Sequence, residues 1–375
     1  MIDEFQVKNF KALRDVKLDL TPLHVLIGPN NSGKTSMLEA LATVGGVNPK
    51  TPPLTMFGQG PPGALLWDPA VDGMINISCR VRDEEGVLAF RASVDPATGA
   101  LKALQAQSGG PVDPLIHQRL LAAIKRPTLV RWSPRMLRLP VMLDVAHPFE
   151  IDPYGFGLAP CLDDILGESR ERFAQLEDRF RQIFPDVQSI ALVVQAAYAR
   201  PQAHQPTALP GLQNVSGKGI LFVLKNGRRI PAAQASDGML LILAFLALAH
   251  APEPPALLLV EEPENGVHPE RLREIFDILT QLTTGDRTQV VITSHSPYLL
   301  DRFKPEQVTL CHRLADGSVG VTRLSTVGEV QRQLKVFSLG EIWTAEGDEN
   351  LAAGAKPTCQ LLRETTGGVE GLRWA

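Results

Sequence analysis

The first fifty residues open with apolar and polar positions that alternate, which is the pattern of half-buried strands. The stretches 4–10 and 15–20 follow this pattern, and the run 24–28 (HVLIG) predicts a buried strand. A helix is then expected from about Gly33, because apolar residues recur at the spacing of one helical face. That face would carry Met37, Leu38, Leu41 and Val44.

The rest of the chain predicts strands and helices in turn. Residues 75–83 and 86–95 alternate like the strands of a hairpin, and 168–184 has apolar residues at helical spacing with mixed charges outside. Asn226-Gly227 stands between two apolar runs, a strong signal for a hairpin with a two-residue turn. From 236 onward the order is helix, buried strand, helix and buried strand, so we predict an α/β fold.

Composition narrows the class of protein. With 375 residues and 44% hydrophobic content, the chain can build one or two cores, and its net charge of −4 leaves nucleic-acid binding to a local patch. The four cysteines form no CxxC pair, which fits a reducing cytoplasm. The N-terminus has no signal-peptide pattern, and the longest apolar run, 239–249, is too short to cross a bilayer. We therefore expect a cytoplasmic protein without membrane contact.

The motif GPNNSGKT, residues 28–35, matches a phosphate-binding loop, and it lies between a predicted strand and a predicted helix as this chemistry requires. Backbone N–H groups and the helix N-terminus would hold the phosphates, Lys34 would reach the β- and γ-phosphates, and Thr35 would bind Mg²⁺. We expect Lys34 to face solvent before a ligand arrives. The alternative, a glycine-rich turn before an ordinary helix, is disfavoured by this context. The residues expected to bind ATP are Gly28, Asn30, Asn31, Ser32, Gly33, Lys34, Thr35 and Ser36.

A pair of glutamates ends the buried strand 257–260. Buried carboxylates need a positive partner, and neighbouring strand residues point to opposite faces, so Glu261 and Glu262 suit two roles. Glu261 would hold Mg²⁺ together with Thr35, and Glu262 would polarise the water that attacks the γ-phosphate. Without the upstream loop, a surface acid pair would be the better interpretation.

Two further motifs could contribute to the same phosphate site. Ser236-Asp237-Gly238 begins a strongly apolar helix; either it is only an N-cap, or its free N–H groups face a phosphate. His295 ends another buried strand, where a histidine is more often structural than catalytic. No nucleophile elbow or orienting acid supports a serine hydrolase.

These motifs, in this order, resemble the ABC-type ATPase heads of the SMC, RecF and OLD families. The opening 5–41 and the stretch EEPENGVHP, 261–269, are similar to the RecF/OLD-type ATPases in particular. The resemblance implies a P-loop NTPase of ABC/SMC-head type, with an antiparallel β subdomain and a helical insertion. It also implies a homodimer that encloses ATP and Mg²⁺.

In that dimer, Ser236, Asp237 and Gly238 would contact the ATP of the other protomer. Glu262 would be the catalytic base and His295 the switch histidine. The segment 263–269 would form the loop between subunits.

The chain departs from the family pattern in several respects. Position 261 is Glu where most such ATPases have Asp, and the glutamine of the lid loop is not recognisable. The sequence shows neither a long coiled coil nor, after His295, an acidic cluster for a TOPRIM nuclease. We expect residues 1–50 and 230–320 to form the ATPase core, 51–229 an inserted β-rich and helical lobe, and 321–375 a C-terminal tail.

One local basic stretch could bind nucleic acid. Arg131, Trp132, Arg135 and Arg138 could follow a phosphate backbone and stack a base. They could equally form a solvated strand face or a brace packed between lobes.

The function expected is that of an ATPase in DNA repair or anti-phage defence, acting with a partner nuclease or toxin. The alternative is an ATP-gated scaffold with little turnover that controls such a partner. A transporter energy subunit is less favoured, because the phosphate loop and the Ser-Asp-Gly motif are too far apart for a compact subunit.

Overall fold

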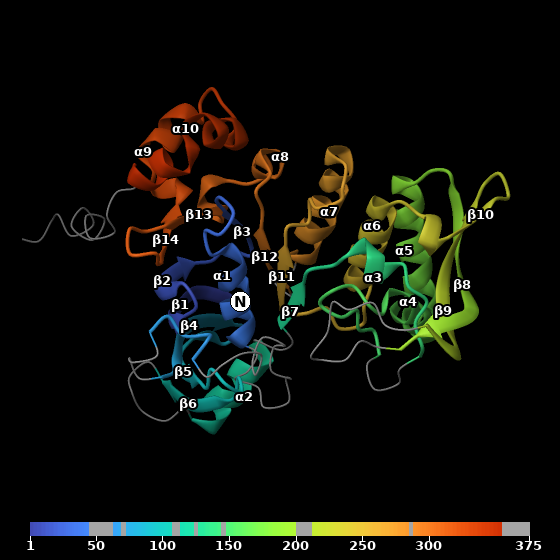
Figure 1. Cartoon of the computed structure of the whole chain (residues 1–375), viewed down its shortest axis with the longest axis horizontal. Coiled ribbons are helices and arrows are strands. Elements are labelled where there is room, and N and C mark those ends of the chain that lie inside the picture. Colours follow the sequence, from blue (N-terminus) through green and yellow to red (C-terminus); the bar gives the residue numbers. More distant parts are fainter. Residues whose placement is uncertain are drawn as a thin grey trace, which may run out of the picture.

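The computed structural model describes residues 1–44, 63–68, 73–106, 113–123, 127–143, 148–199, 212–284 and 288–354. Figure 1 shows a central sheet with structure packed on both of its faces. None of the helices in the described ranges is both long enough and apolar enough to span a bilayer.

The central sheet has six strands in the order β14-β13-β3-β12-β11-β7, and all neighbouring pairs are parallel except β13 with β14. Parallel strands end at the same edge of a sheet, so the loops that follow β3, β12, β11 and β7 meet there. The strands are β3 Leu23–Ile27, β7 Pro127–Val130, β11 Leu257–Glu261, β12 Gln289–Thr293, β13 Val308–Arg313 and β14 Val319–Arg323.

The strands β3, β11 and β12 of this sheet are buried on both faces, as their continuous apolar runs predict. In β11, Leu257 and Leu259 enter one hydrophobic core, whereas Leu258 and Val260 enter the other. Side chains that alternate along one strand therefore pack into cores on opposite faces of the sheet. This packing on both faces fixes the sheet and the loops at its edge.

One core lies between the central sheet and a five-stranded antiparallel sheet of order β2-β1-β4-β5-β6, with α1 packed in it. The elements of this side are β1 Ile2–Phe10, β2 Leu13–Asp19, α1 Lys34–Ala42, β4 Ile75–Asp83, β5 Gly86–Val94, β6 Leu101–Ala106 and α2 Pro114–Ala123. The hairpin predicted from 75–83 and 86–95 is therefore confirmed as β4 and β5.

The other core gathers most of the remaining helices and a three-stranded antiparallel sheet of order β10-β9-β8. Its helices are α3 Pro134–Leu137, α4 Leu158–Glu168, α5 Arg170–Ile183, α6 Asp237–Ala249, α7 Pro269–Leu282, α8 Pro297–Leu300, α9 Gly328–Gln333 and α10 Leu339–Ala353. Its strands are β8 Val187–Tyr198, β9 Leu212–Leu224 and β10 Arg229–Pro231. The apolar face predicted in 168–184 is buried in α5.

Two expectations from the sequence need correction. The strand 127–130 lies at the edge of the central sheet beside β11, so residues 51–229 do not form one separate inserted lobe. Periodicity cannot assign so short a strand to a sheet, because its partner is distant in sequence.

The hairpin predicted at Asn226-Gly227 is confirmed as β9 and β10, but its turn is longer than the predicted two residues. Its strands rejoin where the N–H of Leu224 donates to the carbonyl of Arg228 at 2.8 Å. Gly227 has a φ of +83°, but Asn226 is absent from the described residues with positive φ, so the two-residue type I′ turn does not form.

Candidate functional site

The phosphate-binding loop is held tightly by the neighbouring strands β13 and β14. Gly28 has a φ of +137°, and a side chain there would come within 2.2 Å of the carbonyl oxygen of Cys311. Gly33 has a φ of +95°, and its added Cβ would lie 2.4 Å from the side chain of Val319. Both glycines are therefore required by backbone conformation and by close approach. The loop leads into α1, whose first N–H groups have no partner within the helix and face the place of an anion.

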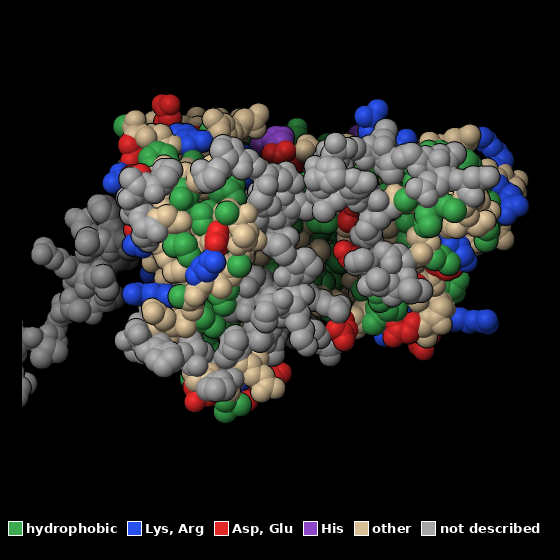
Figure 2. Space-filling view, turned by 60° about the horizontal axis from the view of Figure 1, so that its bottom comes forward, with side chains coloured by type: hydrophobic (Ala, Val, Ile, Leu, Met, Phe, Trp, Pro, Cys, Tyr) green, Lys and Arg blue, Asp and Glu red, His purple; other side chains and the backbone are tan. Residues whose placement is uncertain are grey.

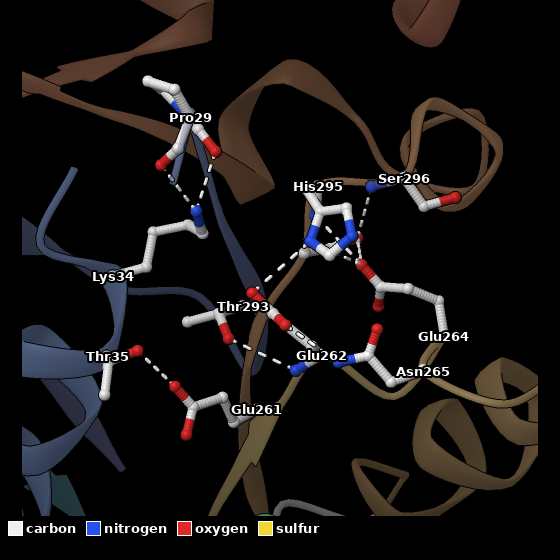
Figure 3. A network of polar contacts seen from close by, with 12 residues as sticks. Pro29, Lys34, Thr35, Glu261, Glu262, Glu264, Asn265, Thr293, His295 and Ser296 are labelled. Carbon is white, nitrogen blue, oxygen red and sulfur yellow. Dashed lines mark hydrogen bonds and ion pairs between the residues drawn. The ribbon is translucent and has the colours of Figure 1, made fainter. Parts of the chain in front are cut away.

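Lys34 is buried, with 5% exposure, rather than facing solvent as expected. Its Nζ donates to the carbonyl oxygens of Gly28 at 2.7 Å and Pro29 at 2.9 Å (Figure 3). A buried ammonium group needs such acceptors, and the curled loop supplies them. In the same loop, the hydroxyl of Ser32 is buried without a hydrogen-bond partner among the described residues. An unsatisfied donor beside a lysine in this loop fits a phosphate ligand.

Thr35 and Glu261 are brought together across the site. The Thr35 hydroxyl donates to the Glu261 carboxylate, joining the first turn of α1 to the end of β11 (Figure 3). A hydroxyl and a carboxylate are oxygen ligands of the kind Mg²⁺ prefers. Among the described residues, no group of three or more His, Cys, Asp or Glu could hold a metal. A metal here would take one protein carboxylate and complete its shell with water and phosphate oxygens, as Mg²⁺ commonly does.

Glu262 points to a different partner from Glu261. Its backbone has a φ of +46°, which turns the chain at the end of β11, and its N–H donates to the carbonyl of Thr293 at 3.0 Å. Its carboxylate accepts a hydrogen bond from the Asn265 side chain at 2.9 Å and lies 3.4 Å from Nδ1 of His295. The two adjacent glutamates therefore have separate surroundings, as the assignment of two roles requires.

Glu264 holds His295 in place, a contact that sequence reasoning missed. One of its carboxylate oxygens accepts from the Ser294 hydroxyl at 2.7 Å and from the His295 backbone N–H at 2.9 Å (Figure 3). The same oxygen lies 3.7 Å from Nδ1 of His295. The third acid of the EEPE stretch was a signal in the sequence, but its partners come from a different strand.

Ser236, Asp237 and Gly238 lie apart from the phosphate loop within this chain. Ser236 caps α6 by accepting from the N–H of Met239 at 3.3 Å, and Asp237 forms an ion pair with Arg138 at 2.6 Å. No hydrogen bond or ion pair of the described residues joins this motif to residues 28–36. An added Cβ at Gly238 would meet nothing within 4 Å, so the helix start is open to an approaching group.

Three of the four side chains of the basic stretch have partners within the chain, as the alternative of a brace predicts. Trp132 packs on Phe245 of α6, with ring centroids 4.9 Å apart, and Arg138 pairs with Asp237. Arg131 points into the site, which leaves Arg135 as the exposed member of the four. Figure 2 shows basic and acidic side chains interspersed on the visible described surface, without one continuous basic patch.

Arg131 belongs to a chain of charged groups beside the metal-side acid. Its Nη2 lies 2.8 Å from Glu39 of α1, its Nε pairs with Glu261, and Lys11 pairs with Glu39 from the β1–β2 turn. Burial opposes the charge of Arg131, but the carboxylates of Glu261 and Glu39 outweigh burial and raise its pKa above the usual value. This role could not be read from the sequence, because the partners lie far away along the chain.

Two family models and one curated relative match parts of the chain. The model described as "AAA domain, putative AbiEii toxin, Type IV TA system" matches residues 162–301, and that described as "AAA ATPase domain" matches residues 1–57. The OLD nuclease of Thermus scotoductus is 23% identical over 366 residues, covering 86% of this chain and 64% of that protein. The chain thus spans less than two thirds of that relative's length.

Solved structures of SMC heads share the fold. An SMC head bound to the C-winged helix domain of ScpA has a TM-score of 0.53 at 14% identity, covering 86% of this chain and 96% of that one. An SMC head with an extended coiled coil, bound to the C-terminal domain of ScpA from Pyrococcus furiosus, has a TM-score of 0.50 at 12% identity, covering 89% and 99%.

Proposed function

Since this chain carries an ATPase head of the ABC/SMC type, we propose that it hydrolyses ATP with Mg²⁺ and dimerises around the nucleotide. The observation that carries the proposal is the meeting of Thr35 with Glu261 across the sheet edge, with Glu262 and His295 directly beside them. A phosphate loop, a metal-side acid and a candidate base are the parts that phosphoryl transfer to water needs.

Each side chain has a task in this proposal. Lys34 exchanges its two neutral carbonyl acceptors for phosphate oxygens, which form stronger charge-assisted bonds. Thr35 and Glu261 would hold Mg²⁺, which when bound neutralises charge on the phosphates. Glu262 takes the proton of the attacking water.

The neighbours of Glu262 keep it in position for that task. Asn265 donates to one oxygen of Glu262, and His295 lies beside the other. Glu264 fixes the backbone of His295, so the base and the histidine stay together when a ligand binds. Ser236 and Gly238, open at the start of α6, would contact the nucleotide of a second protomer.

The biological setting is proposed from the relatives. The match to an OLD nuclease and to a model whose description includes a toxin supports a role in DNA repair or anti-phage defence, with a partner nuclease or toxin. The SMC heads bound to ScpA domains support a protein partner on this fold. Direct contact with DNA is the weaker part, because three of the four candidate side chains have partners inside the chain.

A second candidate function is an ATP-gated scaffold with little turnover. The pairing of Glu261 with Arg131 favours it, because the acid expected to hold the metal already has a cation beside it. The two candidates differ in one measurable quantity, the rate of ATP hydrolysis by the wild-type protein.

Steady-state phosphate release with and without Mg²⁺ tests the proposal. Wild-type protein should hydrolyse ATP. Glu262→Gln should bind ATP normally, but its rate of hydrolysis should be at least about 100-fold lower, as for a lost general base. Glu171→Gln, an exposed glutamate on α5, is the matched control and should hydrolyse at the wild-type rate. Wild-type turnover no faster than that of Glu262→Gln would favour the scaffold.

A further inference from the structure

Arg131 occupies a position that the proposed reaction does not use. It follows β7 directly, and β7 pairs with β11, so its side chain reaches the sheet edge beside Glu261. The side chains are largely buried, with 20% of Arg131, 17% of Glu261 and 8% of Glu39 exposed. Burying charge is unfavourable unless it is paired, and here the guanidinium and the two carboxylates pair with one another.

The two carboxylates hold Arg131 in different ways. Glu39 accepts a hydrogen bond from Nη2 at 2.8 Å and is itself fixed by Lys11. Nε forms an ion pair with Glu261 on the other edge of the guanidinium. Because Glu39 holds Nη2 independently, Glu261 can exchange its partner for another cation while Arg131 stays anchored.

We propose that Arg131 is the internal counter-ion of Glu261 and makes binding of the divalent metal depend on ATP. This inference rests on the proposed function, since it takes Glu261 and Thr35 as the metal-side residues. A carboxylate already neutralised by a guanidinium attracts a hydrated divalent cation weakly. ATP adds phosphate oxygens on the other side of the metal position, so the metal enters with the triphosphate and not before it.

Removing the guanidinium should uncover a metal site in the protein without nucleotide. Glu261 would then stand beside Thr35 without its counter-ion, while Glu39 keeps its pair with Lys11. An uncompensated carboxylate beside a hydroxyl favours a divalent cation. We expect Arg131→Gln to bind Mn²⁺, used in place of Mg²⁺, at least about tenfold more tightly than wild type in the absence of ATP.

Titration with Mn²⁺, with the free ion counted by electron paramagnetic resonance, measures this directly. Arg135→Gln loses the same charge from an exposed position on the same segment and should match wild type. Adding Glu261→Gln to Arg131→Gln should remove the new site. Wild-type protein that binds Mn²⁺ without nucleotide as tightly as Arg131→Gln would overturn the inference.

A charge-balanced variant guards against a folding defect. Arg131→Gln with Glu39→Gln removes one positive and one negative charge, and still leaves Glu261 without its counter-ion. A normal far-ultraviolet circular dichroism spectrum and tighter Mn²⁺ binding than wild type support the inference; a folded double variant with unchanged Mn²⁺ binding overturns it. If wild type fails to bind Mn²⁺ even with ATP, the metal assignment of the proposed function fails instead.

Discussion

At the scale of single residues, the site depends on two neighbours that face different ways. The positive φ of Glu262 turns its carboxylate toward Asn265 and His295, while Glu261 continues the strand and meets Thr35. A non-glycine residue with this backbone conformation is uncommon and costs free energy, so the surrounding contacts must hold it.

Replacing Lys34 should abolish nucleotide binding without unfolding the protein. Lys34→Met keeps the buried apolar stem and removes only the ammonium group, which bonds two loop carbonyls. We expect ATP affinity by calorimetry to fall at least about 100-fold, since charge-assisted bonds to phosphate are lost. Lys8→Met, at a half-exposed ion pair with Asp15, is the control and should bind ATP as wild type does. Unchanged affinity in Lys34→Met would rule out the phosphate-loop assignment.

Protonation of His24 should make the fold less stable in acid. His24 is buried between Thr21 and Thr309, and burial, with help from Arg323, lowers its pKa to about 3. Because the folded-state pKa is below the unfolded value near 6.5, stability is fully present above pH 6.5 and declines between pH 6.5 and 3. From pH 7.5 to 5.5 this group should cost roughly 1.4 kcal/mol of unfolding free energy.

Urea denaturation at the two pH values checks the histidine. His24→Asn should lose less stability on acidification than wild type by about that amount. Equal pH dependence in the two proteins would contradict the assignment of His24.

At the scale of elements, residues 131–138 connect α6 to the edge of the central sheet where the phosphate loop and Glu261 lie. Arg131 contacts Glu261 and Glu39, Trp132 packs on Phe245 of α6, and Arg138 pairs with Asp237 at the start of that helix. Three of the four side chains that could serve DNA binding are therefore engaged in contacts within the protein. Only the contacts of this segment could separate DNA binding from a brace, which the residue types leave open.

Within residues 131–138, the contact of Trp132 with Phe245 should contribute more to the free energy of unfolding than the exposed Arg135 does. Trp132 packs on Phe245, and its indole N–H donates to the carbonyl of Asp152 at 3.1 Å. Trp132→Ala should lower the free energy of unfolding in urea by about 3 kcal/mol, as for other large aromatic truncations. Arg135→Ala should change it by less than about 0.5 kcal/mol, because that side chain is exposed. Similar losses in both variants would exclude a bracing role for Trp132.

At the scale of the whole molecule, α1, which follows the phosphate loop, and α6, which begins after Ser236, lie on different sides of the central sheet (Figure 1). α1 packs in one core and α6 in the other, so one chain does not bring the two motifs to the same phosphate. The proposed dimer would do so, with ATP between Lys34 of one protomer and Ser236 of its partner. Dimer formation would then depend on nucleotide by mass action.

A cation at the start of α6 should dissolve that dimer. In a Glu262→Gln background, which should accumulate with ATP bound, light scattering should detect a dimer with ATP and a monomer without it. Adding Ser236→Arg should give a monomer under both conditions, because the side chain fills the place of the partner's nucleotide. Ser169→Arg removes the N-cap of α5 in the same way and should leave the dimer intact. A dimer that survives Ser236→Arg would contradict this arrangement.

The sequence by itself determined the parts whose chemistry is local. A phosphate loop needs glycines, a lysine and a hydroxyl at fixed spacing, and buried parallel strands need continuous apolar runs. Both patterns could therefore be recognised in the sequence without the structure. The acids at the end of β11 could be recognised too, because their position follows from the strand itself. The structure confirms the α/β fold, the β4–β5 hairpin and the burial of these strands.

Tertiary structure decided the contacts between distant segments. Arg131 and Glu39 are 92 residues apart, and Thr35 and Glu261 are 226 apart, so the order of strands in the central sheet brings each pair together. Glu264 beside His295 and the short strand β7 beside β11 depend on the same order. Periodicity reports which face of an element is buried, but the free energy that selects its neighbour comes from packing across the whole sheet, and this is why the partner of Arg131 could not be found in the sequence.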